Sequence, residues 1–205
     1  MADRDAVELE SFSTELSVAV ALTDRHTDGP PVGEPTVRVT NADVEFTETP
    51  SGYYVLTDLP SVPATLEVVI ESEAYLDQER SITPQALPED DPSLEFSLEP
   101  GPGYPFGSGE TVVRGLVEDA DGPVAGAEVE YVEGTGRTET DARGDYALPI
   151  RDLSSDDLGT DDEGRRALKP DGDDPTIRAT HPDGRTSEVT PTVRIGETTS
   201  ANLSF

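Results

Sequence analysis

Residues 111–148 decide the fold, and they read TVVRGLVEDADGPVAGAEVEYVEGTGRTETDARGDYAL. The β-prone run 113–118 is followed by Asp121-Gly122-Pro123, in which Gly supplies backbone freedom and Pro presets its own φ. In the run 127–131, Ala, Val and Tyr alternate with glutamates, as in a half-buried strand. The chain reverses again at 141–144 before another short β-prone run. This pattern predicts antiparallel strands joined by tight turns.

Three pieces of the same stretch resemble a known family. They are residues 115–119, the run GPVAGA at 122–127, and the pattern T-D-x-x-G-x-Y-x-L at 140–148. Together they are similar to the carboxypeptidase regulatory-like domain, which is a small transthyretin-like sandwich. That family takes its name from a domain that accompanies the peptidase. The resemblance therefore implies a scaffold or binding module without peptidase activity.

The chain as a whole is strongly acidic. It has 205 residues, with 44 Asp and Glu against 14 Lys and Arg, for a formal net charge of −30. Such an excess repels nucleic acid and anionic membranes and destabilises a compact fold in low salt. Molar salt shortens the Debye length to about 3 Å and removes much of this repulsion. The composition indicates adaptation to a salty cytoplasm, and a dedicated cation-binding role for the acids is the alternative.

Targeting signals and thiol chemistry are not expected. The sequence has no cysteine, so it predicts neither a disulfide framework nor thiol catalysis. Its first ten residues, MADRDAVELE, contain no apolar signal-peptide core, and no stretch approaches 18 apolar residues. We expect synthesis in the cytoplasm without a signal peptide, and the protein can still leave the cell as part of a larger particle.

An internal repeat predicts the domain organisation. DGPPVG at 28–33 parallels DGPVAG at 121–126, and TETPSGY at 47–53 parallels TETDARGDY at 138–146. The copies are offset by 91 to 93 residues, close to the usual size of a small sandwich domain. We expect an all-β chain of two tandem transthyretin-like or Ig-like antiparallel β-sandwiches. The predicted parts are an N-terminal arm at 1–14, a first sandwich at 15–100, a linker at 101–110 and a second sandwich at 111–205.

Three glycines are assigned to structural turns. Gly52 and Gly144 occupy equivalent reversals in the two copies, and Gly122 lies in the turn that follows the first strand of the second copy. We expect Gly52 and Gly144 to adopt positive φ, where a Cβ atom is costly.

The linker at 101–110 reads GPGYPFGSGE and carries two aromatic residues, Tyr104 and Phe106. The Pro and Gly content is typical of a domain boundary, whereas a purely flexible spacer would not need aromatic rings. The two rings are expected either to hold the two domains together or to anchor a partner protein.

An acidic insertion at 151–175 interrupts the second copy. Its sequence shows no apolar periodicity, and loops of this length in small sandwiches are usually functional or disordered. Arg165 and Arg166 are candidate contacts for a partner. Calcium takes six to eight oxygen ligands, which the acids of this insertion could supply. The spacing matches no EF-hand, so a solvated, salt-adapted loop is the competing interpretation. The calcium candidates are Asp156, Asp157, Asp161 and Asp162.

The sequence predicts no enzyme and no cofactor. His26 and His181 are the chain's two histidines, both fall in predicted turns, and neither belongs to an HExxH pattern. No G-x-S-x-G, P-loop or dinucleotide fingerprint is present, and carboxylate pairs carry little information in a chain with 44 acids.

The expected function is that of a non-enzymatic structural or adaptor subunit in a large protein assembly. PSGYYVLTDLP at 50–60 and YPFGSGETVVRGLV at 104–117 look like parts of β-sandwich proteins encoded with phage-tail-like contractile injection particles. This resemblance implies such a particle as the assembly, and the acidic composition indicates that it comes from a halophile. The expected partners are other protein subunits, without nucleic acid and without insertion into a membrane. The alternative function is a cell-surface or carbohydrate-binding β-sandwich module.

Overall fold

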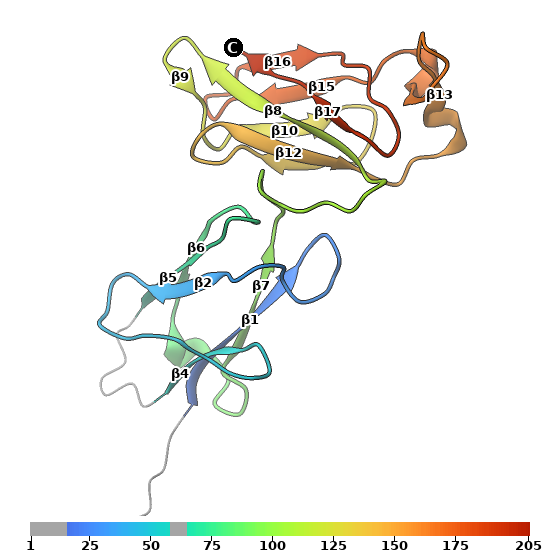
Figure 1. Ribbon diagram of the computed structural model, residues 1–205. Coiled ribbons are helices and arrows are strands. Elements are labelled where there is room, and N and C mark those ends of the chain that lie inside the picture. Colours follow the sequence, from blue (N-terminus) through green and yellow to red (C-terminus); the bar gives the residue numbers. More distant parts are fainter. Residues whose placement is uncertain (1–15, 58–64) are drawn as a thin grey trace, which may run out of the picture. The chain divides into compact units, whose positions relative to one another are not determined.

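The computed structural model describes residues 16–57 and 65–205, apart from the side chain of Asp171. The predicted N-terminal arm at 1–14 lies outside the described residues. The rest is nearly all β, as predicted (Figure 1). Within these ranges no helix is both long and apolar enough to span a bilayer.

The first half of the chain forms two sheets. One has the strand order β3-β4-β1-β7 and the other β2-β5-β6. Alternating apolar residues in β1 and β5 are buried, which is the pattern expected when one face of each strand meets a core. The strands are β1 (Leu16–Asp24), β2 (Thr36–Val39), β3 (Thr47–Glu48), β4 (Tyr54–Thr57), β5 (Leu66–Glu71), β6 (Gln78–Ile82) and β7 (Ser93–Leu98), with a 3₁₀ turn η1 (Pro84–Ala86) before β7.

The second half also forms two main sheets, together with a separate hairpin, β13-β14. One sheet has the order β11-β10-β15-β16, and in the other β8 pairs with β12, β17, β18 and β9. Their facing sides enclose a core that includes Val129, Tyr146, Leu148 and Ile177. The elements are β8 (Thr111–Asp119), β9 (Gly122–Pro123), β10 (Glu128–Tyr131), β11 (Arg137–Glu139), β12 (Asp145–Ile150), η2 (Ser155–Asp157), β13 (Leu158–Thr160), β14 (Arg166–Leu168), η3 (Pro170–Gly172), β15 (Ile177–Thr180), β16 (Thr186–Val189), β17 (Thr198–Ser200) and β18 (Leu203–Ser204).

The strand order repeats between the two halves, as the sequence repeat predicts. The order β4-β1-β7 in the first half corresponds to β12-β8-β17 in the second, and β2-β5-β6 corresponds to β10-β15-β16. The exception is β3, which pairs with β4, whereas its counterpart β11 pairs with β10. The turn glycines agree as well, since Gly52 and Gly144 have φ of +82° and +77°, and Gly122 has φ of +126°.

The sandwiches are not wholly antiparallel. β17 and β18 run parallel to β8, with Thr198 opposite Val112 and Leu203 opposite Val117. In the first half the amide of Ala19 donates to the Pro92 carbonyl and that of Arg25 to the Leu98 carbonyl, so β7 runs parallel to β1 in the same way. The last strand of each copy therefore closes a sheet by a crossover, which the alternating apolar pattern of a single strand does not encode.

The chain divides into two compact units that do not follow the predicted sequence boundaries. Unit 1 contains the described residues of 1–22, 37–69 and 79–96. Unit 2 contains 23–36, 70–78 and 97–205. The turn after β1 and the segment after β5 thus belong with the C-terminal residues, together with all of the predicted linker.

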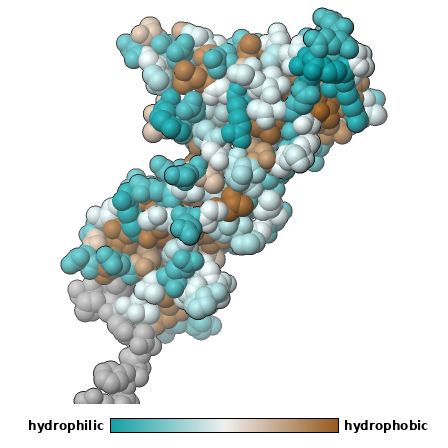
Figure 2. All heavy atoms as spheres, viewed as in Figure 1, coloured by the Kyte–Doolittle hydropathy of each residue, from teal (hydrophilic) through white to brown (hydrophobic). Residues whose placement is uncertain are grey.

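We expect the fold to depend on salt. Hydrophilic residues cover much of the face drawn in Figure 2, and the chain carries a net charge of −30. Lowering KCl from about 1 M to about 0.01 M lengthens the Debye length from about 3 Å to about 30 Å, so repulsion between these charges grows. The β-sheet circular dichroism signal should weaken over this range. An unfolding midpoint that stays constant across it would contradict the interpretation of the acidity as salt adaptation.

Candidate functional site

The predicted linker at 101–110 is a packed segment of unit 2. Gly101 donates its amide to the Ala74 carbonyl at 2.8 Å, and the Tyr104 side chain is 4% exposed. The Tyr104 hydroxyl donates to Oδ2 of Asp24 at 2.6 Å, and Asp24 is completely buried. Tyr104 also packs edge-on against Tyr75, with 5.5 Å between ring centroids. A ring buried in this way is not available to a partner, so the assignment of Tyr104 as a partner contact is corrected.

Hydrogen bonds hold the Asp24 carboxylate in its charged form. Burial by itself disfavours the charge, but the Tyr104 hydroxyl and the backbone N–H of His26, at 2.7 Å from Oδ1, outweigh it and lower the pKa of Asp24. Burial and the neighbouring carboxylate raise the pKa of Tyr75 to about 12. Nothing in the sequence separates Asp24 from the other 43 acids, so this buried carboxylate was missed.

His26 and Phe106 complete the same cluster. The His26 side chain is 4% exposed, and its Nε2 lies 2.9 Å from Oε2 of Glu110. Its ring meets Phe106 edge-on at 5.0 Å between centroids. The Arg114 guanidinium lies 5.3 Å from the centroid of the Phe106 ring and donates to the Tyr104 carbonyl at 2.8 Å. The linker aromatics are thus occupied inside unit 2, and Phe106 is half-buried rather than free.

The predicted acidic loop at 151–175 is an ordered hairpin. Ser154 and Asp157 form a capping box at η2, and β13 and β14 then pair with Leu158 opposite Leu168. Leu168 is buried and donates its amide to the Val193 carbonyl at 2.8 Å, which ties the hairpin to the segment before β17. Figure 1 places β13 at one end of the sheets of the second half, and Figure 2 shows strongly hydrophilic residues gathered in that corner.

Asp161 fixes the tip of this hairpin. Its side chain is 3% exposed, and its carboxylate accepts the amides of Glu163 and Arg165 at 3.0 and 2.8 Å. Nε of Arg194 donates to its second oxygen at 2.8 Å. The arginine and the amides lower the pKa of Asp161. Arg165 and Arg166 are both exposed at the tip, and their role as partner contacts stays a prediction.

The calcium candidates do not form a site. The oxygens of Asp161 are taken by arginine and backbone donors, and Oδ2 of Asp157 accepts the amide and hydroxyl of Ser154, both at 2.7 Å. The side chains of Asp156 and Asp162 are exposed to solvent. Over the described part of the chain, no three His, Cys, Asp or Glu side chains are grouped so that they could hold a metal ion. The calcium hypothesis is corrected, because Asp157 and Asp161 use their oxygens to stabilise turns and the four acids are not grouped around a common point.

Replacing Asp161 by alanine should open the hairpin tip. The substitution leaves Nε of Arg194 and two tip amides without their acceptor, which favours the open conformation. Trypsin should then cut faster after Arg165 and Arg166 in molar KCl, whereas Asp162→Ala, an exposed neighbour, should leave the rate unchanged. Because the pKa of Asp161 is lowered in the fold, its stabilisation is present above the unfolded value near 4 and is lost as the pH falls below it. Equal cleavage of the two variants would contradict the anchoring role.

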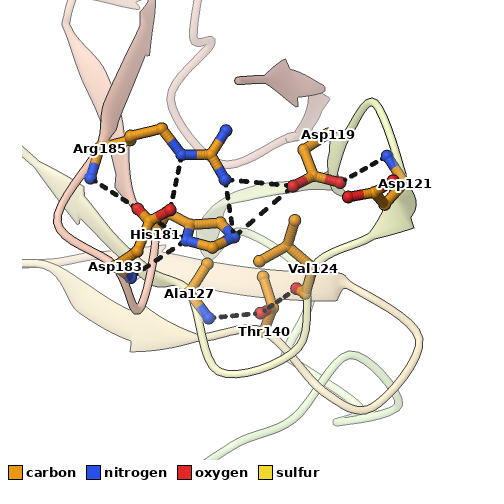
Figure 3. A network of polar contacts seen from close by, with 8 residues as sticks. All are labelled: Asp119, Asp121, Val124, Ala127, Thr140, His181, Asp183 and Arg185. Carbon is orange, nitrogen blue, oxygen red and sulfur yellow. Dashed lines mark hydrogen bonds and ion pairs between the residues drawn. The ribbon is translucent and has the colours of Figure 1, made fainter.

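A second polar network joins two turns of the second half (Figure 3). The Arg185 guanidinium lies 3.2 Å from Oδ2 of Asp119 and donates to Oδ2 of Asp183 at 2.8 Å. The same guanidinium lies 3.2 Å from Nε2 of His181, whose ring meets Phe205 edge-on at 5.1 Å. These contacts clamp the β15-β16 turn onto the end of β8. The backbone N–H of Asp121 lowers the pKa of Asp119 and that of Arg185 lowers the pKa of Asp183, and the Arg185 side chain lowers both further. His181 lies in a turn, as predicted, and serves this clamp.

The buried Thr140 side chain holds the neighbouring turn in place by hydrogen bonds to its backbone (Figure 3). Its hydroxyl accepts the Ala127 amide at 2.8 Å and donates to the Val124 carbonyl at 2.7 Å. This single side chain therefore links the loop before β10 to the chain that follows β11. It is the Thr of the T-D-x-x-G pattern on which the family resemblance rests, so that motif residue has a structural role here.

The open edge of one sheet is β11. Tyr131 donates its amide to the Gly136 carbonyl, and Thr140 donates its amide to the Ala127 carbonyl, so alternate residues of β11 face β10. The backbone groups of Arg137 and Glu139 consequently point away from the sheet. A pocket of about 200 Å³ borders this edge, and its lining includes three arginines from separate segments of unit 2: Arg25, Arg137 and Arg151. Two acids, Glu99 and Asp152, also line it, so the arginines outnumber the carboxylates by one.

Comparisons with known proteins leave the family open. No protein-family model matches the sequence, so that comparison gives no support to the carboxypeptidase regulatory-like resemblance. No curated protein matches it either.

Among solved structures, the Bacillus anthracis TIE protein is similar at a TM-score of 0.25 and 9% identity, covering 96% of this chain but only 41% of that one. A streptococcal ancillary pilin scores 0.23 at 11% identity, covering 94% and 68% of the two chains. The shaft pilin SpaA of Lactobacillus rhamnosus GG scores 0.22 at 10% identity, covering 94% and 98%. Scores this low support no argument about fold or function, and the chain is a β-sandwich protein on the strength of its own structure alone.

Proposed function

We propose that the protein is a non-catalytic structural or adaptor subunit that binds other proteins in a larger assembly. The observation that carries this proposal is the β13-β14 hairpin, whose tip is fixed by Asp161 while Arg165 and Arg166 remain exposed. A contact element that is already ordered loses little conformational freedom when a partner binds. Arginine is also enriched among the residues that dominate binding energy at interfaces.

The narrower proposal is a subunit of a phage-tail-like contractile injection particle from a halophile. Its support is the sequence resemblance at 50–60 and 104–117, together with the acidic composition. Residues 58–60 of the first stretch lie outside the described residues. The second stretch includes Tyr104, Phe106 and Arg114, which hold the linker in place inside unit 2.

Sedimentation in molar salt tests the proposal. Native lysate is expected to place the protein in fast-sedimenting, high-molecular-weight material, and identification of its neighbours distinguishes an injection particle from another assembly. Replacing both Arg165 and Arg166 by glutamate should release the protein, because the tip then repels the partner surface that it meets. The matched control is Arg143→Glu, a charge reversal at an exposed arginine of a different turn. A wild-type protein that runs only as a free monomer, or one with a stable hydrolytic activity, would be incompatible with a structural subunit.

A further inference from the structure

The edge strand β11 has unused hydrogen-bonding capacity. Arg137 and Glu139 each direct an N–H and a C=O outward, and no hydrogen bond from these four groups to another described residue is present. An extended segment placed antiparallel or parallel to β11 would find donors and acceptors at the spacing of a sheet ladder. Peptides that add to exposed sheet edges gain affinity from such main-chain bonds and specificity from pockets for alternate side chains.

The other sheet edges of the second half are less open. Ser187 in β16 donates its hydroxyl to the Ser204 carbonyl at 2.7 Å, which brings β18 against that edge. The outer edge of β12 includes Pro149, which has no N–H to offer. In the first half, Gln78 and Arg80 of β6 reach the carbonyls of Ser97 and Glu95 in β7, at 2.8 and 3.4 Å. These contacts leave β11 more open than the edges at β16, β12 and β6.

The arginine pocket beside β11 indicates the charge of the incoming segment. Arg25 is already paired with Glu99, and Arg137 lies 3.0 Å from Glu130. Arg151 is different, because its guanidinium donates to the His26 carbonyl at 2.8 Å and, within the described residues, forms no ion pair with a carboxylate. Exposed Arg80 and Arg166 also form no ion pair among the described residues, but of these three Arg151 is the one that lines the pocket. A carboxylate from outside could form a two-point contact with it.

We propose that β11 and the adjacent pocket bind an extended acidic segment of a partner protein. The segment adds as a strand to Arg137 and Glu139, and one of its carboxylates enters the pocket and pairs with Arg151. This inference rests on the proposed protein-binding function and names the chemistry of the partner. Charge complementarity with Arg151 favours a carboxylate at this pocket, whereas the acidic surface elsewhere repels such a segment and so confines it to this place.

Peptide binding to the isolated protein tests the proposal separately from any assembly. A fluorescently labelled peptide of alternating valine and glutamate is titrated with the full chain, and anisotropy is read at a KCl concentration where circular dichroism shows the folded protein. The control peptide has glutamine in place of every glutamate. The glutamate peptide is expected to bind at least about tenfold more tightly, corresponding to about 1.4 kcal/mol. Raising KCl further should reduce this difference, because the pocket contact is electrostatic.

Two pairs of variants separate the pocket from the edge. Arg151→Gln should remove the preference for glutamate, while Arg166→Gln, which neutralises an exposed arginine on the hairpin, should leave it intact. Glu139→Pro removes an outward N–H that no described residue uses, and it should abolish binding of both peptides. Glu139→Gln keeps that N–H and should not weaken binding. Each variant is checked first for an unchanged circular dichroism spectrum.

The outcomes decide between clear alternatives. Equal binding of the two peptides overturns the acidic preference, and absence of binding by either one overturns the docking site. Binding that survives Glu139→Pro places the peptide elsewhere and also overturns it. None of these results depends on sedimentation, so a failed peptide experiment leaves the structural-subunit proposal standing. If the protein binds the glutamate peptide but never joins an assembly, the docking site stands and the structural-subunit proposal fails.

Discussion

Replacing Tyr104 by alanine is expected to lower the free energy of unfolding by about 3–5 kcal/mol, the range for removing a large buried aromatic side chain. Two losses combine in this variant. Loss of the ring leaves a void beside Tyr75 and Phe106, whose ring centroids lie 5.5 and 4.7 Å from that of Tyr104. Loss of the hydroxyl leaves Oδ2 of the fully buried Asp24 without its 2.6 Å hydrogen bond. Urea unfolding in molar KCl, followed by circular dichroism, measures the change.

Tyr104→Phe separates the two contributions. It keeps the ring and removes only the hydroxyl, so the cost should fall to about 1–3 kcal/mol, the penalty for leaving a buried polar group unpaired. The pH dependence should change too. Asp24 has a lowered pKa in the fold, so its stabilisation is present above the unfolded value near 4 and is lost as the pH falls through the folded value. Without the hydroxyl this acid-sensitive part should shrink. A Tyr104→Ala protein as stable as wild type would show that the linker is not packed as described.

Replacing Gly115 by alanine is expected to cost about 3 kcal/mol or more, at the upper end of overpacking penalties. A Cβ atom on Gly115 would overlap the carbonyl oxygen of Ala201 and lie 2.6 Å from its carbon. That carbonyl cannot retreat freely, because it accepts the Tyr146 hydroxyl at 2.6 Å, and the Ala201 amide donates to the Arg114 carbonyl at 2.8 Å. The extra methyl group must therefore separate β8 from the chain between β17 and β18.

The matched control is Gly107→Ala. A Cβ atom there meets only the flexible side chain of Glu110, at an ordinary 3.5 Å. Its effect on the urea midpoint should be small, whereas Gly115→Ala should shift the midpoint strongly and leave the denaturant slope unchanged. If both variants unfold at the wild-type midpoint, β8 does not approach Ala201 as closely as the structure shows.

The sequence predicts the strands well because their signal is local. Alternating apolar residues at 127–131 gave the expected strand, and the turn glycines Gly52 and Gly144 have the expected positive φ. β6 was missed, since its sequence QERSI has no apolar alternation and is held by its place beside β5. The parallel pairing of β17 and β18 with β8 was also missed, because register between distant strands is set by tertiary packing.

The candidate surfaces were less predictable, because burial determines which side chains are enclosed by hydrogen bonds and which are free to meet a partner. Composition marks residues 151–175 as acidic, but it does not reveal that Asp161 is enclosed by Arg194 and backbone amides while Asp162 is exposed. Tyr104 stood out correctly as an unusual residue for a linker, yet its partner, Asp24, lies 80 positions away in the sequence. Such a pair becomes visible only once the fold brings the two segments together.

The parallel closure of β8 by β17 and β18 has a consequence for synthesis on the ribosome. β8 at 111–119 leaves the ribosome long before its partners at 198–204, and until then one side of this strand has no native neighbour. Contacts between such distant segments slow folding, and they leave a strand edge exposed to wrong partners in the meantime. The second sandwich is therefore expected to complete its core only after residue 204 has emerged. Nascent chains arrested before that point should be open to proteases and should be captured by chaperones.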